Sequence, residues 1–125
     1  LVLQSFEQIG MGHKVGESLT QKFEFIVDEK VFFTEAFRSD DRNSLKEHDF
    51  ELILQFYQDL IGRKTSTPLG EDLQFLLEMY CRGSVYMTVK WVLIGMKDSP
   101  AKMSKKLVEA MPPRLAAVFD ELKLL

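Results

Sequence analysis

The chain has 125 residues, 46% of them hydrophobic, and a formal net charge of −3, which together suit one globular domain over residues 1–125 and make direct binding to nucleic-acid phosphates unfavourable. Its one cysteine, Cys81, cannot form an internal disulfide, so the fold needs no oxidising compartment. The richest apolar stretch, residues 85–96, is shorter than the about 20 residues that span a bilayer, so we expect a cytoplasmic protein without a membrane partner.

The first predicted elements are helices, because no stretch alternates apolar and polar residues with period two. Residues 1–9 carry apolar residues at helical spacing and resemble the end of a longer linking helix. Glycines, the last of them Gly16, are expected to break this helix. The next helix is expected to begin at Ser18, where Ser18 and Gln21 match a capping box.

Two further helices are predicted in the middle of the chain. A short helix is expected over residues 31–37, followed by a polar turn. Ser44 and Glu47 match a second capping box, which predicts the start of a long helix that ends near residue 61. Apolar residues cover more than half of the surface of this long helix, so it is expected to be central.

The segment 68–96 predicts a helix that is apolar on two faces. Thr67 can cap this helix, and Pro68 suits its first position. A helix with two apolar faces must be covered on both, so one face needs a ligand or a partner subunit. Gly83 and Ser84 would let another helix approach closely. One stripe contains Leu69, Leu73, Leu76, Tyr80, Ser84, Met87 and Trp91, and the other contains Phe75, Met79, Arg82, Tyr86, Val89, Leu93 and Met96.

The last predicted helices are marked by glycine and proline. Gly95 is expected to end the preceding helix, while Ser99 and Pro100 provide the cap and first residue of a helix over 100–111. Pro112-Pro113 forces a break. A final amphipathic helix carries Leu115, Val118, Phe119 and Leu122.

No catalytic motif is recognisable in the sequence. It contains no glycine-rich phosphate loop, no serine elbow and no Cys-x-x-Cys pair. His13 and His48 stand alone, and Cys81 is expected to be a small buried hydrophobe. A helical enzyme would need a metal or a cluster of carboxylates and histidines, which the spacing does not supply. We therefore predict no enzymatic activity, no catalytic residues, no cofactor and no metal.

Binding is the remaining class of function, and two interpretations of the aromatic residues stay open. All of them can belong to the core, or some can line an apolar pocket between helices, with tyrosine hydroxyls and Arg82 orienting a ligand. The residues predicted to line such a pocket are Phe33, Phe37, Phe50, Tyr57, Phe75, Met79 and Tyr86.

Several short motifs resemble the C-terminal domains of TetR-family transcriptional regulators. In many of those domains a long helix ends in Lys-Trp followed by Gly-Met, and Ser-Pro opens the next helix. The segment 28–37 resembles the family's short helix, and the resemblance covers about residues 18–111. It implies an all-α, antiparallel helical bundle. The matching residues are Lys90, Trp91, Gly95, Met96, Ser99, Pro100 and Met103.

The resemblance also implies a function. Such domains bind an effector and form homodimers, in which helices corresponding to 68–96 and 100–111 would pack against the same pair of the partner. DNA is read by an N-terminal helix-turn-helix domain, which this sequence lacks, so DNA would be a partner only through that missing domain. We therefore expect a homodimeric regulatory domain that senses a small apolar or amphipathic effector. The alternative is a helical protein–protein adaptor without a small-molecule site. The residues predicted for the dimer interface are Tyr80, Ser84, Met87, Trp91, Met103 and Leu107.

Overall fold

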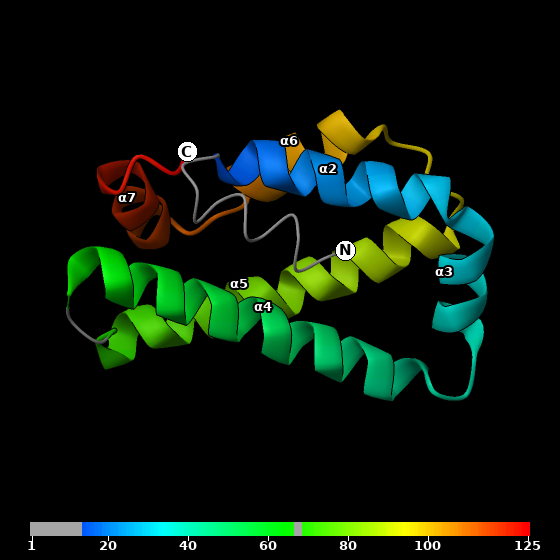
Figure 1. Cartoon of the computed structure of the whole chain (residues 1–125), viewed down its shortest axis with the longest axis horizontal. Coiled ribbons are helices and arrows are strands. Elements are labelled where there is room, and N and C mark those ends of the chain that lie inside the picture. Colours follow the sequence, from blue (N-terminus) through cyan, green and yellow to red (C-terminus); the bar gives the residue numbers. More distant parts are fainter. Residues whose placement is uncertain (1–13, 67–68) are drawn as a thin grey trace.

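The computed structural model describes residues 14–66 and 69–125, and these form helices and connecting turns without a strand (Figure 1). The prediction of an all-α fold is confirmed. The helix predicted over residues 1–9 and the cap at Thr67 and Pro68 lie outside the described residues. The helices are α2 (Val15–Asp28), α3 (Lys30–Arg38), α4 (Arg42–Thr65), α5 (Glu71–Leu93), α6 (Pro100–Glu109) and α7 (Pro113–Glu121).

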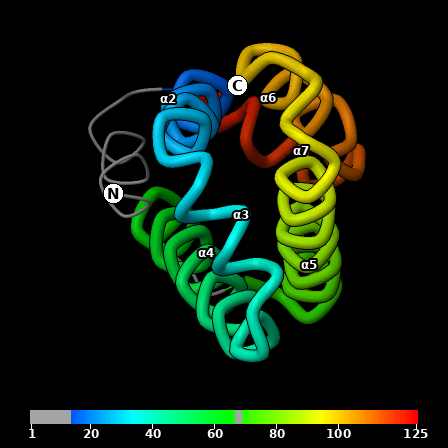
Figure 2. Tube along the Cα trace, turned by 90° about the vertical axis from the view of Figure 1, so that its right-hand side faces the viewer, coloured from blue at the N-terminus to red at the C-terminus, as the bar shows by residue number. Residues whose placement is uncertain are grey.

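Four helices form the body of the bundle, and successive ones run in opposite directions (Figure 1). Helix α2 packs most closely along α6, and α4 packs along α5. The pair α2 and α6 lies above the pair α4 and α5 in both views (Figure 2). The short helix α3 contacts α5, α4 and α2 at one end, so it joins the two pairs.

Helix α2 begins at Val15, so the capping box predicted at Ser18 is wrong. The backbone N–H of Lys14 donates to the Glu17 carboxylate at 3.3 Å, and Ser18 lies buried inside the helix. Gly16, predicted as a break, is also helical. Its carbonyl accepts a hydrogen bond from Ser104 of α6 at 2.6 Å, so the packing of α6 supports the first turn of α2.

The capping box predicted at Ser44 is also wrong, because α4 begins at Arg42 with Asp41 before it. The carboxylate of Glu47 binds Arg82 of α5 instead of the start of its own helix. Helix α4 continues to Thr65, beyond the predicted end, and α5 begins at Glu71.

The end of α5 and the start of α6 follow local sequence signals. Helix α5 ends at Leu93, and Gly95 and Met96 take left-handed conformations with φ of 98° and 56°. The N–H of Met96 donates to the carbonyl of Trp91 at 2.8 Å, which makes this a Schellman motif. The predicted cap is confirmed, since the Ser99 hydroxyl accepts a hydrogen bond from the backbone N–H of Lys102 at 3.2 Å.

The last helix completes the core. Phe119 of α7 is fully buried, and its ring centre lies 5.5 Å from that of Tyr57. The carbonyl of Leu124 accepts a hydrogen bond from the N–H of Val15 at 2.7 Å, which ties the end of the described chain to the start of α2. Among the described residues, no helix has the length and apolar character needed to cross a membrane.

Candidate functional site

The outward-facing side of α5 carries uncovered large apolar side chains among exposed charged ones such as Arg82 and Lys90. The six large apolar residues exposed on α5 and at its C-terminal end are called the outer stripe. Phe75, Met79 and Tyr86 are the most exposed, at 62%, 61% and 65%. Their spacing of four and seven residues places them on one side of the helix. An exposed group of large apolar side chains of this kind marks an interaction surface. The members of the outer stripe are Phe75, Met79, Tyr86, Met87, Leu93 and Ile94.

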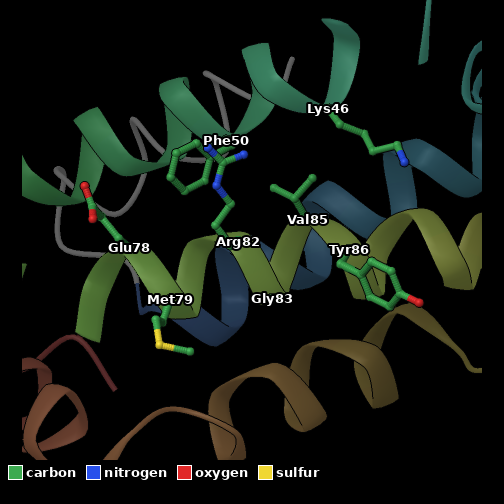
Figure 3. Close-up of a pocket in the computed structure, with 8 residues that line it drawn as sticks. All are labelled: Lys46, Phe50, Glu78, Met79, Arg82, Gly83, Val85 and Tyr86. Atoms are coloured by element: carbon green, nitrogen blue, oxygen red, sulfur yellow. The ribbon is translucent and has the colours of Figure 1, made fainter. Parts of the chain in front are cut away.

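An open groove of about 760 Å³ runs between α4 and the outer stripe (Figure 3). Arg82 reaches from α5 toward α4, where its guanidinium carbon lies 3.6 Å from the centre of the Phe50 ring. Its two terminal nitrogens lie 2.5 Å and 2.9 Å from the carboxylate oxygens of Glu47. This hydrogen bonding keeps the pKa of Glu47 below its usual value. The Arg82 side chain that lines the groove is therefore already paired with α4, through Phe50 and Glu47.

A second hollow lies between the outer stripe and α6. It consists of two adjoining depressions of about 290 Å³ and 360 Å³, which share Met87, Leu107 and Ala110. Gly83 lines the first depression, and a Cβ added there would meet no atom within 4 Å. The surface beside Gly83 is therefore open enough for a helix to approach.

The interior between the two helix pairs contains a few polar side chains among its apolar ones. Lys22 of α2 is only 6% exposed and contributes to a small cavity of about 10 Å³. The Tyr80 hydroxyl donates to the carbonyl of Leu107, and that of Ser84 donates to the carbonyl of Tyr80 at 2.7 Å. The cavity is lined by Leu19, Lys22, Ile53, Tyr57, Tyr80, Ser84, Thr88 and Leu107, and we call this set the interior cluster.

Burial shifts the pKa values of the groups in and around the interior cluster. It lowers the pKa of Lys22, an effect that the charge of Asp49 opposes, and it raises the pKa of Asp49. It also raises the pKa values of Tyr57 and Tyr80 above the usual range. The pKa of the Cys81 thiol rises to about 12. Cys81 is therefore a neutral, buried thiol at neutral pH, which agrees with its predicted role as a small hydrophobe.

Three of the residues predicted for the ligand pocket, Phe50, Met79 and Tyr86, line the outer groove together, whereas the other four lie elsewhere. Tyr57 belongs to the interior cluster, whereas Phe50 lines the outer groove. Phe37 is buried and Phe33 half-buried, and their ring centres lie 6.2 Å apart in the α3 region. The remaining three, Phe75, Met79 and Tyr86, lie on the outer stripe.

The six residues predicted for the dimer interface all line the second hollow between α5 and α6, although the single chain covers most of their surface. Trp91, Met103 and Leu107 are buried, and the Trp91 indole N–H donates to the carbonyl of Asp98 at 2.9 Å. Tyr80 and Ser84 are half-buried in the interior cluster. Only Met87 of this set belongs to the outer stripe. The division of the long helix between pocket and interface therefore stays a prediction.

Lys22 was missed when the sequence was read for candidate sites, although a signal was present. It falls between Leu19 and Ile26 at helical spacing, so it occupies the buried face of α2. In the part of the chain that the structure describes, no three histidine, cysteine or acidic side chains gather as a metal site would require.

Comparison with known protein families identifies the chain. A family model described as "transcriptional regulator C-terminal region" matches residues 14–112, which is most of the sequence and nearly all of the helical bundle. No curated protein and no solved structure gave a significant match. The chain belongs to the C-terminal regions of TetR-family transcriptional regulators.

Proposed function

We propose that this chain is a cytoplasmic regulatory domain that forms homodimers through the outer stripe and senses a small apolar or amphipathic molecule. The observation that carries the proposal is the outer stripe, where three side chains are more than 60% exposed on one face of α5. In water, packing this face against the same face of a second copy is favourable, because the apolar surface of both copies is removed from solvent. A two-fold dimer uses one patch twice.

The proposal divides the residues of α5 differently from the sequence-based prediction. Phe75, Met79 and Tyr86 contact the partner, together with Met87, because these side chains are exposed in the single chain. Tyr80 faces the interior, where its hydroxyl is hydrogen-bonded to α6. The surface around Gly83 lets the partner helix approach closely, since nothing fills the space above it.

Effector binding would act on the arrangement of the two helix pairs. A ligand shifts a conformational equilibrium only as far as it binds one state more tightly than the other. A molecule bound between α2–α6 and α4–α5 would favour a more separated arrangement. In a dimer, this change reaches DNA-reading domains attached to each subunit, whose half-sites lie about 34–36 Å apart. The net charge of −3 leaves contact with DNA to such separate domains.

Sedimentation equilibrium from low to high micromolar concentration tests the assembly. We expect a dimer for the native chain and a monomer for the double variant Met79→Glu/Tyr86→Glu, because burying two carboxylates in an apolar interface is unfavourable. Phe32→Glu on α3 is the matched control, since Phe32 is 63% exposed but lies outside the outer stripe. A native chain that stays monomeric at high micromolar concentration, or a control that dissociates as readily as the double variant, contradicts the proposal.

The second candidate function is a protein–protein adaptor without a small-molecule site. The small volume of the interior cavity, about 10 Å³, favours this alternative because it holds no more than about one water molecule. Native mass spectrometry of protein purified from cells separates the two candidates. A retained small molecule supports the sensor, and a heteromeric complex without one supports the adaptor.

A further inference from the structure

Lys22 is placed where a lysine is costly. Its side chain projects from the buried face of α2 and is only 6% exposed. An ammonium group loses its hydration on burial, and an apolar residue of similar size is often as stable or more stable at such a position. Asp49, which is partly buried, acts on Lys22 through its charge. A buried charge pair of this kind is weak evidence for a purely stabilising role.

The surroundings of Lys22 resemble the wall of a ligand site more than the centre of a core. Tyr57, Tyr80, Ser84 and Thr88 line the same small cavity. The hydroxyls of the last three donate hydrogen bonds to backbone carbonyls of α5 and α6. One turn before Lys22 on α2, the hydroxyl of Ser18 is buried without a hydrogen-bond partner. Apolar walls with a few polar groups and one charged group are typical of pockets for small molecules.

The location allows this cavity to open. It lies between the helix pairs α2–α6 and α4–α5, and its lining comes from all four helices. The most extensive helix packing is between α2 and α6 and between α4 and α5. Moving one pair away from the other would leave the packing within each pair intact. A ligand can therefore enlarge the cavity from about 10 Å³ by moving one pair relative to the other.

We propose that the interior cluster binds the anionic group of a small molecule, a carboxylate or a phosphate, at the ammonium of Lys22, with the apolar part of the molecule lying between the helix pairs. This inference rests on the proposed sensing function and specifies the chemical class of the effector. The opposite charge of the ligand offsets the desolvation of Lys22, whose ammonium donates a charge-assisted hydrogen bond to the anion. Such a ligand binds the separated arrangement more tightly, which is what an effector requires.

The test uses titration calorimetry with simple probes at neutral pH. Sodium octanoate and sodium benzoate are compared with octanol and benzyl alcohol, and inorganic phosphate is tested alone. We expect at least one carboxylate to bind the native chain about 10-fold or more tightly than the alcohol of the same skeleton, or phosphate alone to bind. Lys22→Met should lose this preference, and Lys64→Met, an exposed lysine on α4, should retain it.

A second measurement keeps the test independent of any variant's folding. Amide chemical shifts of the native chain are recorded with and without the bound anion, and we expect changes around Ser18, Lys22 and Tyr57. The inference is overturned if no anion binds the native chain, if the alcohols bind equally well, if folded Lys22→Met binds as the native chain does, or if the shifts follow the outer stripe.

The results also separate this inference from the proposed dimer. A native dimer that binds none of the anions refutes the anion site and leaves the dimer standing. A monomer that binds octanoate through Lys22 refutes the dimer and leaves the anion site standing.

Discussion

Large apolar side chains occur on both the inner and the outer face of α5, but only those on the inner face are buried. Leu77, Cys81 and Val92 on the inner face are fully buried against the other helices. Phe75 and Met79 on the outer face are just as apolar, yet both are more than 60% exposed. The hydrophobic pattern of a helix therefore identifies which of its faces are apolar, whereas the tertiary structure shows which of those faces are buried within the single chain.

The largest expected contrast is in thiol reactivity. Cys81 is buried, and its pKa of about 12 keeps it protonated at pH 8. We expect Cys81 to react with a disulfide reagent on the order of 10³-fold more slowly than a thiol introduced on the outer face, because reaction requires the chain to open. The rates are measured on the native chain and on Cys81→Ala/Met79→Cys.

Two controls define this contrast. In denaturant, both proteins should react at similar rates, which shows that the reagent distinguishes only the folded environments. In the folded double variant, raising the protein concentration should slow the reaction if the outer stripe dimerises. Rapid modification of Cys81 in the native chain would contradict the burial of the inner face of α5.

A smaller contrast is expected in the free energy of unfolding. Leu77→Ala should lower it by about 2–5 kcal/mol, because the truncation leaves a cavity in a fully buried site. Phe75→Ala should change it by less than about 0.5 kcal/mol at protein concentrations low enough to keep the chain monomeric. Urea denaturation followed by circular dichroism measures both values.

The dependence of unfolding on protein concentration distinguishes the same two variants further. If Phe75 contacts a partner, the loss of stability in Phe75→Ala should grow as the concentration rises, because dimerisation stabilises the native chain more than the variant. The effect of Leu77→Ala should persist at every concentration. An equal effect of the two substitutions at low concentration would contradict the exposed position of Phe75.

The smallest expected effect is that of Gly83→Ala. A new Cβ meets no atom of its own chain within 4 Å, so the monomer should gain up to about 1 kcal/mol of stability from the higher helix propensity of alanine. If a partner helix lies close to Gly83, the same methyl group should weaken the dimer. The free energy of unfolding at low concentration and the dimer dissociation constant should therefore both rise, because the monomer becomes more stable while the dimer becomes weaker. A more stable chain with an unchanged dissociation constant would place the partner elsewhere.

Helix boundaries show where local sequence signals are sufficient. The cap at Ser99 followed by Pro100 was predicted correctly, because both residues act on the first turn of their own helix. The caps at Ser18 and Ser44 were wrong. Ser18 is buried in the packing of α2, and the glutamate three residues after Ser44 binds Arg82 of α5, so contacts distant in sequence replaced the local hydrogen bonds.

The candidate sites were less predictable than the fold. The two apolar faces of α5 were visible in its spacing, but the assignment of Phe75 and Trp91 to pocket or partner depends on the position of α6 and α4. Lys22 could have been noticed as a charged residue on a buried face. Its place in the lining of one cavity with Tyr57 and Tyr80 could not, because α2, α4 and α5 are far apart in sequence.

Local signals in the sequence are enough to establish that the chain is helical, where α5 ends and α6 begins, and that α5 has more apolar surface than one face can hold. These signals suffice because propensity, capping and periodicity act within a few residues. Which face of α5 stays exposed, and which polar residues line a cavity with Lys22, follows only from the packing of the helices. Both depend on how whole helices are oriented, and that orientation is set by the sum of many side-chain contacts between distant segments.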